Sequence, residues 1–118
     1  MRSAKWNVAI MTEEFKFNPS YRSTVLKKAA QLVCKDRAEQ HGEAIDNFTV
    51  IANYWTAHIN ARFKTDIKLQ ANDVCDMMEL FKIGRRNASP SNIENYTDAC
   101  GYGALSYEMF SVRMKKEN

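Results

Sequence analysis

Residues 46–63 have the sequence DNFTVIANYWTAHINARF, and this segment decides the fold class. Its apolar side chains recur at steps of three and four residues, which places them on one face of an α-helix. The members of this stripe are Phe48, Ile51, Ala52, Trp55 and Ile59. A short polar segment, Lys64-Thr65-Asp66, follows. The sequence therefore predicts a long amphipathic helix with one buried face.

Three further segments have the same period. The first starts at Ser20, a predicted N-cap, and ends at Gly42, while the last starts at Ser91, where Ser91 and Glu94 form a capping-box pattern. The stripes expected on these helices are Val25, Leu26, Ala29, Ala30 and Val33 in the first; Val74, Met77, Met78 and Phe81 in residues 72–86; and Ile93, Tyr96, Cys100, Gly103, Tyr107 and Phe110 in the last.

The length and the scarcity of turn residues agree with this pattern. A chain of 118 residues is long enough for one domain with one core. It has only four glycines and two prolines, whereas a many-stranded protein needs frequent turns. We predict an all-α fold: a four-helix bundle-like domain over residues 20–118, with an extended N-terminal arm over residues 1–19.

Charge and composition limit the classes of ligand and partner that the protein is expected to bind. The net charge of +3 permits an anionic ligand, but the chain lacks the dense basic stripe of a dedicated DNA-binding protein. It has no apolar run long enough for a membrane span and no signal-peptide pattern at its start. Cys34, Cys75 and Cys100 form no CxxC pair, which is typical of reduced thiols in a cytoplasmic protein.

Some apolar residues of the last helix lie off its expected stripe. Leu105 and Met109 are such residues, and Tyr102 lies beside them. Because a monomer has no second core to cover them, we expect a homo-oligomer with these side chains between subunits.

Basic side chains on the third helix suggest an anion site. Arg85 falls on the side of Met77 and Phe81, with Lys82 at its margin. An arginine on a core face requires a carboxylate or an anionic ligand. The two interpretations are that its head group contacts a carboxylate or solvent, or that Lys82, Arg85 and Arg86 bind phosphates.

The turn between the first two helices gathers Arg37, His41, Asp46 and Asn47. His41 and the backbone amides at Gly42 could form the edge of a pocket. The alternative is a glycine that ends a helix, beside a solvated histidine.

Four carboxylates form two helical pairs. Asp76 and Glu79 are spaced i,i+3, and Glu94 and Asp98 are spaced i,i+4, so each pair shares a face. Oxygen ligands so placed suit Mg²⁺. The alternative is that Glu94 belongs to the capping box, while Asp76 and Glu79 lie on a solvated face.

A family resemblance covers about residues 23–108. It rests on DRAEQHG (36–42), DNF (46–48), IANYW (51–55), DVCDMMELFKIGR (73–85) and ENYTDACGY (94–102). This pattern resembles a small helical family encoded mostly by bacteriophages and prophages, of unknown function. His41 stands where that family usually has tyrosine, and Glu94 where it usually has aspartate.

That family is in turn similar to the all-α nucleoside triphosphate pyrophosphohydrolases of the MazG type, which bind Mg²⁺ through ExxE and ExxD pairs. Asp76 and Glu79 match the first pair in order. The spacing from Glu94 to Asp98 is one residue longer than in the second, and the doubled glutamate before the first pair is missing. The resemblance therefore implies nucleotide binding more than hydrolysis.

Two functions follow as expectations. The first is a phage accessory protein in the cytoplasm of the infected bacterium that binds a nucleotide or cyclic nucleotide, and could hydrolyse it with Mg²⁺. The second is a non-catalytic protein that sequesters a nucleotide signal or inhibits a host defence protein, and a purely structural module remains a third interpretation. The expected ligand contacts are Arg37, His41, Asn47, Lys82, Arg85 and Tyr102, and the expected metal ligands are Asp76, Glu79, Glu94 and Asp98.

Overall fold

A computed structural model describes residues 20–36 and 43–117 of the chain. These contain α3 (Tyr21–Gln31), the π-helical segment η2 (Leu32–Asp36), α5 (Ala44–Phe63), α6 (Ala71–Arg85) and α7 (Glu94–Glu117). Within the described ranges there is no strand, which confirms the all-α prediction. The arm expected over residues 1–19, and Arg37 and His41, lie outside the described residues.

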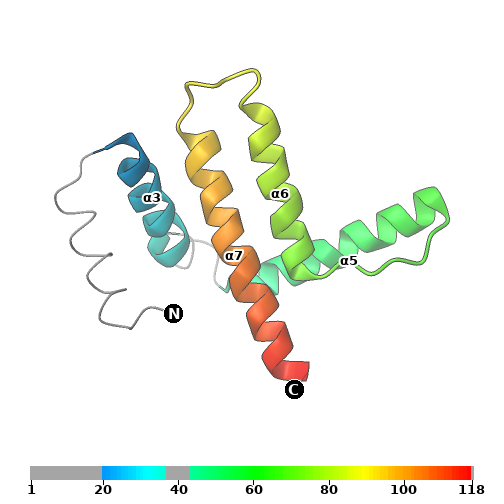
Figure 1. The fold of residues 1–118 in the computed structure, drawn as a ribbon. Helices are drawn as coiled ribbons and strands as arrows, with labels where there is room; N and C mark the ends of the chain where they lie inside the picture. The colour runs from blue at the N-terminus through cyan, green and yellow to red at the C-terminus, as the bar shows by residue number, and fades with distance from the viewer. Residues whose placement is uncertain (1–19, 37–42, 118) are drawn as a thin grey trace.

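The helices form an open bundle built on one antiparallel pair. α6 and α7 lie side by side, α3 packs on the other edge of α7, and α5 crosses the lower part of the pair and projects away from it (Figure 1). The core lies at this crossing. It consists of Phe48 and Ala52 from α5, Val74 and Cys75 from α6, and Leu105 and Met109 from α7.

The helix starts follow local hydrogen bonds. The Ser20 hydroxyl oxygen accepts from the Ser23 N–H at 3.4 Å, which confirms the predicted N-cap of α3. The predicted capping box of Ser91 is wrong, because α7 begins only at Glu94, where the Asn92 side-chain oxygen accepts from the Glu94 N–H at 3.0 Å.

The expected stripe of α5 is confirmed, since Phe48 and Ala52 are buried and Trp55 is half-buried against the core. On α6 the expected stripe is only half correct. Val74 is fully buried, but Met77 and Phe81 are 40% and 53% exposed. The inner face is instead centred on Val74, Cys75 and Met78, because α6 carries apolar side chains on opposite faces.

On α7 half of the expected stripe faces outward, since Cys100, Tyr107 and Phe110 are exposed while Ile93, Tyr96 and Gly103 are partly buried. Tyr107 is 76% exposed, whereas Leu105 and Met109 are buried in the chain's own core. Tyr102 packs edge-on against Phe48, with ring centroids 6.2 Å apart. The predicted placement of Leu105 and Met109 between subunits is therefore wrong, because the chain buries both side chains in its own core, whereas Tyr102 is half-buried.

A close approach between η2 and α7 partly explains which face of α7 points inward. A Cβ at Gly101 would lie 2.9 Å from Cγ1 of Val33. Only glycine allows the two segments to come this near, so the Gly101 side of α7 is fixed inward.

The outer end of α5 is held by the segment that returns from it. Lys64, in the left-handed conformation at φ 58°, ends the helix. The side chain of Asn60 then donates to the Ile67 carbonyl at 3.0 Å and accepts from the Ile67 N–H at 2.9 Å.

No helix in the described residues is long and apolar enough to cross a membrane.

Candidate ligand site

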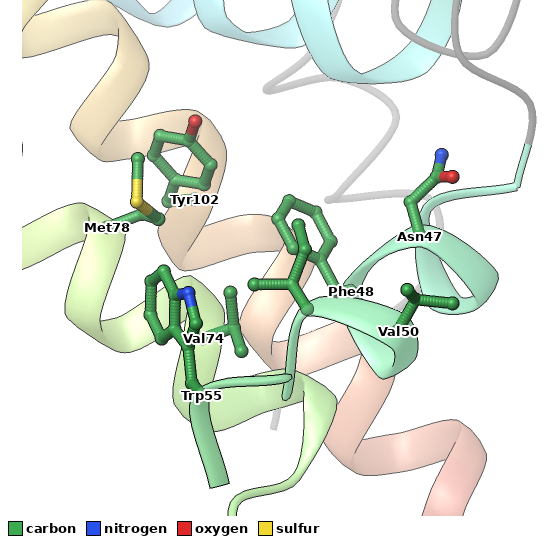
Figure 2. A pocket seen from close by; sticks show the side chains of 8 residues that line it. Asn47, Phe48, Val50, Trp55, Val74, Met78 and Tyr102 are labelled. Atoms are coloured by element: carbon green, nitrogen blue, oxygen red, sulfur yellow. The ribbon is translucent and has the colours of Figure 1, made fainter. Parts of the chain in front are cut away.

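A pocket of about 520 Å³ opens between α5, α6 and α7, and we call it the aromatic pocket. Its size lies in the range of small-molecule sites. It is lined by Asn47, Phe48, Val50, Ile51, Trp55, Val74, Met78 and Tyr102. Figure 2 shows the rings of Phe48, Trp55 and Tyr102 around this space. Phe48 and Trp55 come from different turns of α5, and Tyr102 comes from α7.

Helical periodicity places these side chains. Phe48, Ile51 and Trp55 follow one another at three- and four-residue steps on α5. Val74 and Met78 are one turn apart on α6, and Tyr102 reaches in from α7. α5 crosses the α6–α7 pair at an angle (Figure 1), and the pocket lies where side chains of the three helices meet near this crossing.

The lining has a definite chemistry. Three aromatic rings and the thioether of Met78 offer flat, polarisable surfaces. The Tyr102 hydroxyl, the Trp55 indole N–H and the Asn47 amide supply the polar groups. None of the described residues that line it carries a formal charge. The described lining is therefore suited to a flat, neutral heteroaromatic group.

A cation lies further along the same side of α6. Arg85 follows Met78 by seven residues, which is two helical turns and about 10 Å along the axis. Its guanidinium carbon lies 5.6 Å from the centroid of the Phe81 ring. Contrary to the expectation of a core-facing arginine, the side chain is exposed, so it needs no buried partner.

Most other predicted site residues hold α6 and α7 together. Lys82 and Asp98 form an ion pair at 2.9 Å, with side chains 17% and 29% exposed. The Ser106 hydroxyl donates to the Asp76 carboxylate at 2.6 Å. The Glu79 carboxylate lies against α7, with one oxygen 3.3 Å from where a Gly103 Cβ would be. These polar groups form a seam along the helix pair.

The four predicted metal ligands are spread along this seam. Asp98 pairs with Lys82, Asp76 pairs with Ser106, and Glu94 is exposed at the start of α7. In the described part of the chain, no three His, Cys, Asp or Glu side chains gather in a way that could hold a metal ion. The structure thus brings Asn47 and Tyr102 together in the aromatic pocket, but it does not bring the carboxylates together.

Sequence reasoning missed most of the pocket lining. It assigned Phe48, Trp55, Val74 and Met78 to the core stripes and not to a cavity. One feature of the sequence could have indicated the pocket: α5 and α6 carry more apolar residues than a single buried helix face can hold. A second hollow, of about 590 Å³, includes Cys34 and Glu43, which flank residues 37–42 in the chain. We assign it no function.

Comparison with known proteins places the chain in a family. The model of the family described as Domain of unknown function (DUF6378) matches residues 24–110. The chain belongs to this family. It is also similar to the Gene 55 protein of Mycobacterium phage L5, with 28% identity over 86 residues, which are 73% of this chain and 52% of that protein. The chain thus spans about half the length of this relative.

No solved structure matches the chain. The predicted resemblance to a small phage family of unknown function is confirmed. The further likeness to MazG-type pyrophosphohydrolases is not shown by these comparisons and stays a prediction.

Proposed function

We propose that this protein binds a nucleotide without hydrolysing it, with the base in the aromatic pocket. The observation that carries the proposal is the placement of Trp55 and Tyr102 around one open space of about 520 Å³, with the buried ring of Phe48 forming the wall behind them. Stacking of a nucleobase on an aromatic side chain contributes about 1–3 kcal/mol per base. The polar tips of Tyr102 and Trp55 can pair with the base edge.

Arg85 supports the assignment of a phosphate-bearing ligand. It lies on the same side of α6 as Met78 and about 10 Å beyond it, which suits a base at one end and a phosphate at the other. An exposed guanidinium binds phosphate through two parallel hydrogen bonds. Lys82 has a smaller role in this proposal, because its ammonium group already pairs with Asp98.

The arrangement of the carboxylates favours binding over hydrolysis. Metal-assisted attack on a phosphate needs several oxygen ligands around one ion. Asp76 and Asp98 are instead engaged with Ser106 and Lys82 along the α6–α7 seam. Since a phage protein is among the relatives, we propose that the role is to sequester a nucleotide signal of the host.

The test is titration with adenosine 5′-monophosphate and, separately, adenosine, followed by Trp55 fluorescence in a Trp6→Phe background. We expect binding of both, with the monophosphate tighter. Arg85→Ala should lower the affinity for the monophosphate by about 10- to 150-fold, to that for adenosine, because a charge-assisted contact is worth about 1.5–3 kcal/mol.

A matched pair of tyrosines on α7 provides the control. Tyr102→Ala removes a pocket ring, whereas Tyr107→Ala removes a ring that is 76% exposed on the outward face. Only the first should weaken binding. If Tyr102→Ala binds the monophosphate as tightly as the unaltered protein, or if neither probe binds, the proposal is wrong. Return of intact adenosine 5′-triphosphate after incubation with Mg²⁺ is expected, and its conversion to the monophosphate and pyrophosphate would contradict the non-catalytic assignment.

A further inference from the structure

α6 carries a second apolar stripe that faces away from α7. Met77, Leu80, Phe81 and Gly84 are spaced i, i+3, i+4 and i+7, so they share one face. Met77, Leu80 and Phe81 are 40%, 66% and 53% exposed. We call these four residues the outer stripe. Packing among the described residues does not explain why this exposed face is apolar.

Gly84 is the least expected member of the outer stripe. Glycine inside a helix costs about 1 kcal/mol relative to alanine. A Cβ added at Gly84 would meet no atom of the described residues within 4 Å, so no close approach among residues 20–36 and 43–117 requires this glycine. Gly101 is different, because there Val33 leaves no room for a Cβ.

We infer that the outer stripe is the centre of a homodimer interface, in which α6 packs antiparallel on α6 of a second copy. A two-fold axis between residues 80 and 81 places Leu80 opposite Phe81 of the second copy. The same axis places Met77 opposite Gly84 of the second copy. The long side chain of Met77 thus faces the one position without a side chain, so the stripe is complementary to itself, as a two-fold interface requires.

The outer stripe exposes part of the apolar area that a dimer interface needs. Its three large side chains, Met77, Leu80 and Phe81, expose roughly 320 Å², taking about 200 Å² for each residue. A standard dimer interface buries about 800 Å² on each partner, so the stripe would form the centre of the interface and neighbouring surface its rim.

The inference is independent of the proposed ligand. Met77, Leu80, Phe81 and Gly84 are not among the described residues that line the aromatic pocket. Dimerisation is tested with no nucleotide present. A monomer would overturn this inference alone, and a dimer that binds no nucleotide would overturn the proposed function alone.

The test is the molar mass in solution, measured by light scattering and sedimentation over the micromolar range. We expect twice the 13.6 kDa of the chain. Leu80→Lys should raise the dissociation constant of the dimer at least tenfold, while helicity by circular dichroism stays unchanged. The lysine lies one turn after Asp76, so the helix itself is not weakened. Tyr107→Lys, at a residue 76% exposed on α7, is the matched control and should leave the dimer intact.

Gly84→Leu separates the interface from the fold. It should raise the melting temperature of the monomer, since leucine favours the helix, and it should dissociate the dimer, since Met77 of the second copy loses its space. The inference is overturned if the unaltered protein stays monomeric over the concentration range. It is equally overturned if the dimer persists in both Leu80→Lys and Gly84→Leu, or if Tyr107→Lys dissociates it.

Discussion

The α6–α7 pair and helix α5 have the same apolar period but very different surroundings. The pair lies side by side along its length, with Val74, Cys75 and Met109 buried between the helices and the Lys82–Asp98 ion pair at the seam. α5 buries Phe48 and Ala52 in the core, and its contact with the core extends to the half-buried Trp55 near the middle of the helix. Tyr54 and Phe63 are 74% and 62% exposed, and the helix projects from the body (Figure 1).

This difference shows that an amphipathic period does not set how much of a face is buried. Burial of α5 is limited by the angle at which it crosses the pair. The uncovered part of its apolar face forms the aromatic pocket, and the outer face of α6 exposes a further stripe. The apolar surface left over from packing is therefore where we place both the ligand and the second copy.

The largest expected effect compares two aromatic residues of α5. Phe48 is 3% exposed in the core, whereas Trp55 is half-buried at the pocket. Phe48→Ala should lower the free energy of unfolding by about 3–5 kcal/mol. Trp55→Ala should cost only about 2 kcal/mol, because part of the indole already contacts solvent. Urea unfolding followed by circular dichroism measures both. An equal loss for the two variants would mean that the pocket is closed in solution.

The helices themselves could be predicted from the sequence. The helices expected over residues 46–63 and 72–86 are observed as Ala44–Phe63 and Ala71–Arg85. The agreement is close because the helical spacing of apolar residues, together with the short polar segments between helices, defines where each helix begins and ends. The inward face of α7 could not be predicted. Its two candidate stripes, one with Tyr107 and one with Met109, are both apolar, and only the contact of Gly101 with Val33 and the pairing with α6 decide between them.

The candidate site was predictable only in part. Asn47 and Tyr102 were expected as ligand contacts and line one pocket, while Lys82 and Asp98 were expected at the site and pair with each other. The rings of Phe48 and Trp55 could not be told from core residues, because a pocket wall and a core face have the same helical period. The crossing angle of α5, which separates the two, depends on contacts distant in sequence.

An intermediate effect is expected from a pair of glycines in the two-helix body. Gly101→Ala should destabilise the protein by about 1 kcal/mol, since the overlap with Val33 outweighs the gain in helix propensity. Val33 is β-branched and cannot easily rotate away. Gly84→Ala, where a Cβ meets nothing within 4 Å, should stabilise the monomer by about 0.5–1 kcal/mol. Thermal unfolding at concentrations below the dimer dissociation constant compares the two, and stabilisation by both would show that η2 does not approach α7 closely.

The smallest effect on global stability is expected at the outer end of α5. The Asn60 side chain makes two hydrogen bonds to the Ile67 backbone and also accepts from the Thr65 hydroxyl at 2.8 Å. Asn60→Ala therefore releases the returning segment but leaves the core untouched, and the free energy of unfolding should fall by less than about 1 kcal/mol.

The local consequence of Asn60→Ala should be much larger. Hydrogen exchange at the Ile67 amide should become fast, while amides of α6 and α7 keep their protection, because the outer part of α5 opens independently of the pair. Asn53→Ala is the matched control, since it removes a single exposed hydrogen bond, from Lys68 at 3.1 Å. If Asn60→Ala also accelerated exchange in α6 and α7, the projecting end of α5 and the helix pair would unfold as one unit. The two regions would then differ in solvent exposure but not in local stability.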